Sequence, residues 1–118
     1  MSSPKSRLNW EILIPSWVDE NGAGILEFEI EALGSYIAHS NCIRRRIREY
    51  QRVVRNLCGG LPYKPAQREY RRCHHYLCDA FREGRKVKVK AIENCSPGEL
   101  NERWRHWIGQ RGTLNETN

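Results

Sequence analysis

The sequence predicts a mainly α-helical fold with a small β component. Apolar residues recur every three or four positions through the middle of the chain and again near its C-terminus, which is the spacing of one helix face. Alternation of apolar and polar residues, the pattern of a half-buried strand, is confined to two short stretches. We therefore expect a central basic helical hairpin, short flanking strands and a C-terminal helix.

The N-terminal third is predicted to contain one strand and one helix. Over residues 8 to 18, apolar side chains fall at even spacing until Pro15, which predicts a short strand. Apolar residues then step by four, three and four between Leu26 and Ala38. This second spacing predicts a helix.

The hairpin is expected to occupy about residues 43–83. Its first helix should end at Gly59 and Gly60, and its second should begin near Pro65, a residue suited to a first helical turn. The apolar stripe of the first helix is Ile43, Ile47, Tyr50, Val54 and Leu57. The buried face of the second is expected to be Ala66, Tyr70, Cys73 or His74, Leu77 and Phe81.

A strand and a last helix are predicted after the hairpin. Residues 85–92 alternate basic and apolar side chains, and the lysines suggest a strand at the edge of a sheet. Ser96, Pro97 and Glu99 form a capping box with proline at the first helical position. The helix that they begin should run to Gly109.

The length of 118 residues suits one small domain, which we place at residues 1–109, followed by a disordered tail at 110–118. With 39% hydrophobic residues and a mean hydropathy of −0.76, the core should be thin, so self-association is a candidate source of stability. No apolar run approaches the roughly 18 residues that span a bilayer. The five cysteines lack the density of a secreted disulfide scaffold. We therefore expect a soluble protein of a reducing compartment.

Charge is divided unevenly along the chain. Residues 1–35 contain two Lys and Arg against six Asp and Glu, residues 43–90 contain fifteen against four, and residues 91–118 contain three against four. The net charges of these segments are −4, +11 and −1. Such a distribution predicts a basic face that attracts a polyanion or an acidic protein surface.

Arginines are densest in the first predicted helix of the hairpin, where six lie between Arg44 and Arg55 with Glu49 as the one acid among them. A basic helix is usually a solvated face, but repulsion at this density favours a polyanion beside it. We predict contacts to a phosphate backbone that do not read its sequence, with Tyr36, Tyr50, Tyr63, Tyr70 and Tyr76 as candidates for stacking on single-stranded bases. Tyr50 and Tyr70 fall on the apolar stripes of the two helices, so packing in the core is the favoured role for these two. The candidate residues for nucleic-acid or partner binding are Arg44, Arg45, Arg46, Arg48, Arg52, Arg55, Arg68, Arg71 and Arg72.

The sequence does not predict an enzyme. It has no glycine-rich nucleotide loop, no serine in a nucleophile elbow and no prominent pair of carboxylates. Cys73 or Cys78 with a neighbouring histidine as base is the alternative, but cysteines on an apolar helix face are more often packing residues.

Zinc is the one candidate cofactor. Two His-x-x-Cys pairs, His39 with Cys42 and His75 with Cys78, have the ligand types and spacing of two corners of a tetrahedral site. A thin core would gain stability from a structural metal. The alternative is that these side chains pack without a metal.

Two patterns in the hairpin segment match those of a known family. Residues 47–55 read Ile-Arg-acid, three further residues, two aliphatic residues and Arg, and residues 63–77 have the spacing Tyr-x-x-Ala-x-x-x-Tyr-x-x-x-His-x-x-Leu. The core positions of the two patterns are Ile47, Val54, Tyr63, Ala66, Tyr70, His74 and Leu77. In both, the segment resembles the precoat proteins of geminiviruses, plant viruses with single-stranded DNA, as a divergent member.

The resemblance implies a viral suppressor of host RNA-mediated, post-transcriptional gene silencing. It implies that the protein binds a host silencing factor, a coiled-coil cofactor of double-stranded RNA synthesis, and that it assists viral movement. The implied location is the host cytoplasm, including the perinuclear region, with the nucleus as a second location. The alternative, from charge alone, is an accessory protein that binds single-stranded RNA or DNA non-specifically, with or without zinc.

Overall fold

A four-stranded mixed β-sheet lies at the centre of the computed structural model, which describes residues 8–63 and 69–115. Of the described residues, 41% are helical and 25% lie in strands, so the chain is a small α/β domain and the mainly α-helical prediction is wrong. β1 runs parallel to β4, and the other neighbouring strands are antiparallel. In spatial order the strands are β1 (Trp10–Leu13), β4 (Val87–Asn94), β2 (Gly24–Ile30) and β3 (Gly34–Ser40).

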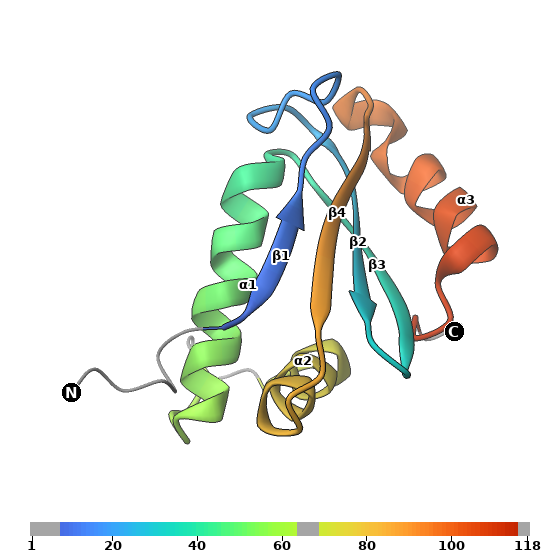
Figure 1. Cartoon of the computed structure of the whole chain (residues 1–118). Helices are drawn as coiled ribbons and strands as arrows, with labels where there is room; N and C mark the ends of the chain where they lie inside the picture. The colour runs from blue at the N-terminus through green and yellow to red at the C-terminus, as the bar shows by residue number, and fades with distance from the viewer. Residues whose placement is uncertain (1–7, 64–68, 116–118) are drawn as a thin grey trace.

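Helices cover both faces of this sheet (Figure 1). α1 (Ile43–Cys58) and α2 (Arg72–Arg82) pack on one face, while a 3-10 turn, η2 (Pro97–Glu99), leads into α3 (Leu100–Arg111) on the other. Alternate residues of β2 enter the two cores, because successive side chains of a strand point to opposite faces. Leu26 and Phe28 pack toward α1 and α2, whereas Ile25 packs toward α3.

The helix predicted between Leu26 and Ala38 is instead the β2–β3 hairpin. The four-three-four spacing combined apolar residues from two strands with Leu33, which lies in the turn and is 45% exposed. The turn includes Ala32 at a φ of +62°, a backbone conformation that continues neither a strand nor a right-handed helix. Apolar and acidic residues alternate from Leu26 to Glu31, which is the pattern of a strand, and the helix prediction did not take this alternation into account.

The first hairpin helix is confirmed as α1. Its apolar stripe is buried at Ile43, Ile47, Tyr50 and Val54, and Gly60 takes the left-handed conformation, with a φ of +77°, just beyond the helix end.

The second hairpin helix begins later than predicted, at Arg72. Pro65 and Ala66 lie outside the described residues. α1 and α2 contact each other, but their apolar faces are completed by the sheet. The central hairpin is therefore one layer of the domain and does not form the core by itself.

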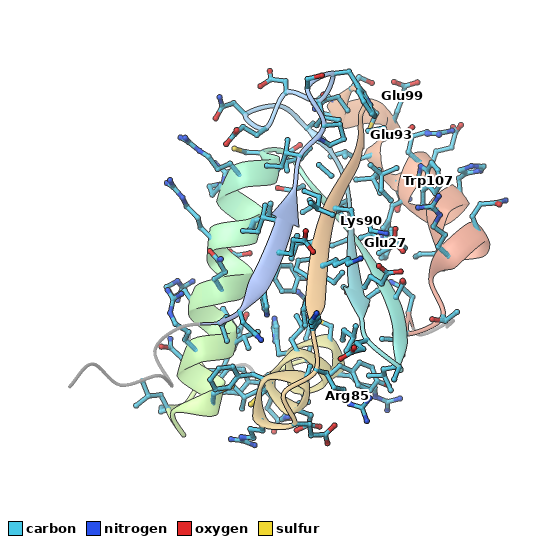
Figure 2. The ribbon with its side chains drawn as sticks, in the orientation of Figure 1. Glu27, Arg85, Lys90, Glu93, Glu99 and Trp107 are labelled. Carbon is cyan, nitrogen blue, oxygen red and sulfur yellow. The ribbon has the colours of Figure 1, made fainter. Side chains whose placement is uncertain are left out.

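β4 confirms the predicted strand, but its predicted edge position is wrong, because it lies between β1 and β2. Lys88 is opposite Glu11 of β1 and Glu29 of β2, and Lys90 forms an ion pair with Glu29 at 3.1 Å. The lysines of β4 therefore face glutamates on both neighbouring strands, on the side of the sheet that also holds Glu27 (Figure 2).

The capping box at Ser96 and Glu99 is confirmed, with the Ser96 hydroxyl 2.9 Å from the Glu99 carboxylate. α3 then continues past Gly109, into the region expected to be a disordered tail. Beyond α3, Thr113, Leu114 and Asn115 bond to the outer edge of β3. The Ser35 amide donates to the Thr113 hydroxyl at 2.9 Å, the Leu114 amide donates to the Ser35 carbonyl at 2.9 Å, and the Asn115 side chain bonds both backbone groups of Ile37.

A buried carboxylate ties the end of α3 to the sheet. Glu27 of β2 is 3% exposed, accepts a hydrogen bond from the Ser35 hydroxyl at 2.7 Å and lies 3.0 Å from the Arg111 guanidinium. A buried charge is tolerated when it is paired and hydrogen-bonded in this way. The interaction joins β2, β3 and the last turn of α3.

Replacing Gly34 with alanine should destabilise the domain. Gly34 has a φ of +147°, and an added Cβ would lie 2.3 Å from the Thr113 hydroxyl oxygen. Backbone strain and displacement of the C-terminal segment should together lower the free energy of unfolding by about 1–3 kcal/mol, measured by urea denaturation. Gly98→Ala is the matched control, because its Cβ meets no atom within 4 Å. Equal unfolding free energies for the two variants would contradict the role assigned to Gly34.

Candidate functional site

The outer face of α1 carries an arginine ridge, which we define as Arg45, Arg48, Arg52 and Arg55. All four side chains are exposed, and their spacing of three, four and three aligns them along the helix. Among the described residues, none of the four has an ion-pair partner. Side chains with nitrogen tips project from α1 on the side away from the sheet (Figure 2). The ridge therefore presents uncompensated positive charge to solvent.

The other arginines predicted for binding are placed differently. Arg44 lies 3.9 Å from the Glu20 carboxylate, and Arg46 forms an ion pair with Glu49. Arg71 and Arg72 are at the start of α2, and Arg68 lies outside the described residues. The described arginines of the predicted set are thus divided between the ridge, the first turn of α1 and the start of α2.

A second basic feature, the edge groove, lies beside β3. It consists of two cavities, of about 210 and about 380 Å³, that share Tyr36, Arg71 and Trp104 as lining residues. The smaller one is completed by Ala38, His39, Arg46 and Tyr50, and the larger one by Arg72, Cys73, Leu114 and Asn115. The groove thus combines cationic and aromatic side chains from β3, α1, α2 and α3.

Contacts inside the groove hold its side chains in place. Arg71 donates a hydrogen bond to the Tyr50 hydroxyl at 3.4 Å, and the Trp104 indole N–H donates to the Ile37 carbonyl at 2.8 Å. The His39 ring packs edge-on against Trp104 at 4.8 Å. Burial, followed by the nearby guanidinium groups of Arg46 and Arg71, lowers the pKa of His39, so this histidine is neutral at pH 7.

Sequence reasoning named Tyr36 and Tyr50 as stacking candidates but did not include Trp104. Trp104 is 68 positions from Tyr36 in the chain, and only the packing of α3 across β3 brings the two to one groove.

The predicted zinc site is not assembled. His39 lies on β3 against Trp104, His75 is exposed on α2, and no group of three or more His, Cys, Asp or Glu side chains gathers in the described part of the chain. The Cys78 sulfur instead lies 2.8 Å from the Cys58 sulfur. Burial, with the hydrogen bond to Cys78, raises the pKa of the Cys58 thiol to about 12, so it is protonated at neutral pH. A protonated thiol is a poor ligand and a poor nucleophile.

The described family-like residues form an aliphatic group and an aromatic group, and Tyr50 joins the two. Ile47, Val54 and Leu77 are buried together between the helices and the sheet. Tyr63 stacks on His74 at 5.9 Å, and Tyr70 packs edge-on against both rings. Ala66, the remaining member of the pattern, lies outside the described residues.

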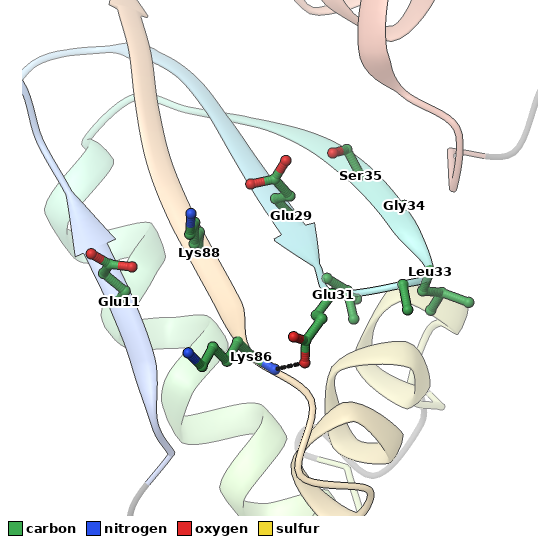
Figure 3. A pocket seen from close by; sticks show the side chains of 10 residues that line it. Glu11, Glu29, Glu31, Leu33, Gly34, Ser35, Lys86 and Lys88 are labelled. Carbon is green, nitrogen blue, oxygen red and sulfur yellow. Dashed lines mark hydrogen bonds between the residues drawn. The ribbon is translucent and has the colours of Figure 1, made fainter.

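A larger, open cavity of about 760 Å³ lies on the α3 side of the sheet (Figure 3). It is lined by Glu11, Glu29, Glu31, Lys86 and Lys88 together with the β2–β3 turn, and the Glu31 carboxylate accepts a hydrogen bond from the Lys86 amide at 3.2 Å. Acidic and basic side chains alternate across its strands, so their fields largely cancel. This cavity offers a polyanion much less attraction than the ridge or the edge groove.

Comparisons of this chain with protein-family models, with characterised proteins and with solved structures find no match. Within residues 8–63 and 69–115, no helix is both long enough and apolar enough to cross a membrane.

The stability of the domain should fall as His74 is protonated. Its Nδ1 accepts a hydrogen bond from the Arg71 amide at 3.0 Å, and burial, followed by the charge of Arg71, lowers its pKa from 6.5 to about 4. Because the unfolded chain binds this proton more readily, the stabilisation is complete above pH 6.5 and is lost as the pH falls toward 4. The loss should be on the order of 3 kcal/mol, measured as unfolding free energy in urea.

His74→Gln provides the control for this pH dependence. Glutamine supplies an uncharged acceptor at the same capping position, so the variant should lose less stability over the same pH range. His75 is the next residue in the chain and is exposed, and His75→Gln should leave the pH profile nearly unchanged. A parallel decline for wild type and His74→Gln would show that other groups cause the acid sensitivity.

Proposed function

We propose that this chain is a non-enzymatic plant-virus protein that suppresses host RNA silencing by binding a host silencing factor in the cytoplasm. The proposal is based on one observation: the described family-like residues pack together between α1, α2 and the sheet. Spacing alone is shared by many helices, but here Tyr63, Tyr70 and His74 also form one aromatic cluster. The resemblance to geminivirus precoat proteins therefore corresponds to a structural unit of the domain.

The arginine ridge is the surface of this unit that best suits a protein partner. Ile47 and Val54 face the core, and Arg48 and Arg55, which immediately follow them, face solvent. A row of guanidinium groups along a helix complements a partner helix with acidic positions at similar spacing, as coiled-coil proteins provide. Charge complementarity of this kind also speeds association and fixes orientation.

Arg48→Ala combined with Arg55→Ala should abolish silencing suppression in a leaf reporter assay and leave the fold intact. Both side chains are exposed, so their removal should change the free energy of unfolding by no more than about 0.5 kcal/mol. Arg82→Ala combined with Arg105→Ala is the matched control, since it removes two exposed arginines from α2 and α3.

The control should suppress silencing as wild type does. Leu77→Asp should also lose suppression, but through unfolding, because Leu77 is 1% exposed and an unpaired buried charge is strongly destabilising. Full suppression by a folded ridge variant would exclude the ridge as the partner surface.

Non-specific binding of single-stranded RNA or DNA is the second candidate function. The edge groove favours this function. Like the ridge, it includes residues of α1, and it contains aromatic side chains beside its arginines. Aromatic rings stack on bases of any sequence, and guanidinium groups contact phosphates. Nuclease treatment of a plant extract before pull-down separates the two candidates, because only a direct protein contact survives it.

If single strands bind the ridge, Arg45, Arg48 and Arg52 together should account for part of the salt dependence. Each phosphate contact contributes about 0.7 to the slope of log affinity against log salt for single strands, so the triple Gln variant should lower the slope by about 2. The measurement is a filter-binding titration with an oligothymidylate across salt concentrations. An unchanged slope would remove the ridge from the nucleic-acid interface.

A further inference from the structure

The edge groove contains an exposed arginine, Arg71, at the start of α2. Among the described residues, Arg71 has no carboxylate partner, and its guanidinium donates a hydrogen bond to the uncharged hydroxyl of Tyr50. Arg46, on the other wall of the smaller cavity, is paired with Glu49 through one terminal nitrogen. A guanidinium has five N–H donors, so both arginines retain donors for an anion.

Apart from Arg72, the other residues that line the groove carry no formal charge at pH 7, and several of them are aromatic. Tyr36 and Trp104 line both cavities, and the indole of Trp104 is held in position by its bond to the Ile37 carbonyl. Burial is the main cause that raises the pKa of Tyr36, and His39 is neutral, so neither adds charge at pH 7. The combined size of the cavities lies in the range of small-molecule sites.

We propose that the edge groove binds one nucleoside phosphate, with the phosphate at Arg46 and Arg71 and the base against Trp104 and Tyr36. Phosphate suits paired guanidinium groups because it accepts several charge-assisted hydrogen bonds at once. A planar base suits a cavity walled by aromatic rings. The proposal rests on the nucleic-acid-binding alternative above and gives that activity a defined pocket, separate from the ridge.

The backbone of β3 adds a reason for a planar, hydrogen-bonding ligand at this place. The C-terminal segment bonds the outer edge of β3 at Ser35 and Ile37. His39 is two positions further along the strand and lines the smaller cavity instead. Residues of a strand that are two apart present their backbone groups to the same side, so the outer backbone groups of His39 lie toward the groove. They can bond the polar edge of a base.

The test is a titration of the full chain with uridine monophosphate, followed by amide and indole NMR signals. Binding should shift the Trp104 indole and the His39 amide, and uridine monophosphate should bind more tightly than inorganic phosphate. Arg71→Gln should weaken binding by about tenfold, because a charge-assisted hydrogen-bond donor is removed. Arg52→Gln is the control with the same charge change on the ridge, and it should leave mononucleotide affinity unchanged.

Two further experiments show whether the groove takes free nucleotides or nucleotides of a strand, and whether nucleic-acid binding depends on the groove. Displacement of uridine monophosphate by a 5′-phosphorylated hexathymidylate would assign the groove to nucleotides of a strand, and lack of displacement would assign it to free nucleotides. Equal weakening by Arg71→Gln and Arg52→Gln, or equal affinity for inorganic phosphate and uridine monophosphate, would overturn the nucleotide pocket. If Arg52→Gln alone reduces hexathymidylate binding, nucleic-acid binding stands without the groove.

Discussion

The packing of Tyr50 is the interaction on which both the core and the candidate site depend. Its ring contacts Phe28 of β2 at 4.7 Å and His74 of α2 at 5.6 Å, and Phe28 in turn contacts Trp10 of β1. This line of aromatic contacts joins two strands and two helices on one side of the sheet. Aromatic pairs of this kind stabilise a core beyond the area that they bury. The thin core expected from composition is therefore strengthened by ring contacts in one line.

The hydroxyl of the same tyrosine reaches the edge groove. Burial raises the pKa of Tyr50 well above its ordinary value, so the hydroxyl stays protonated and accepts a hydrogen bond from Arg71. Arg71 also caps α2 through its backbone amide, which donates to His74. The position of the arginine in the groove is thus set by the core, and a change that loosens Tyr50 or His74 would also displace the cation.

Charge is separated by the sheet itself. On the α3 side, glutamates of β1 and β2 face lysines of β4, and Glu27 is held by Arg111. On the α1 side, the helix exposes arginines that the described residues leave unpaired. Because charges are paired on the α3 side and positive charge is in excess on the α1 side, the positive electrostatic potential of the protein is strongest near α1. The ridge and the edge groove lie in this field, yet they consist of different arginines, so substitutions can separate a protein partner from a nucleotide.

Local patterns in the sequence were sufficient for α1, β1, β4 and the capping box before α3, because each depends on neighbours a few positions apart. They failed for β2 and β3, where Leu33 of the turn completed an apparent helical spacing. They also gave the wrong position for β4 in the sheet. Its lysines suggested an edge strand, but glutamates on β1 and β2 lie opposite them and neutralise their charge inside the sheet.

The arginine ridge was determined by the sequence alone, since the three-four spacing on one helix decides which side chains share a face. Only tertiary structure decided the edge groove, the contact between the free thiols of Cys58 and Cys78, and the separation of the two His-x-x-Cys pairs. Each of these depends on contacts between residues 20 or more positions apart. The position of such residues is set by how the helices pack on the sheet, which no local spacing encodes.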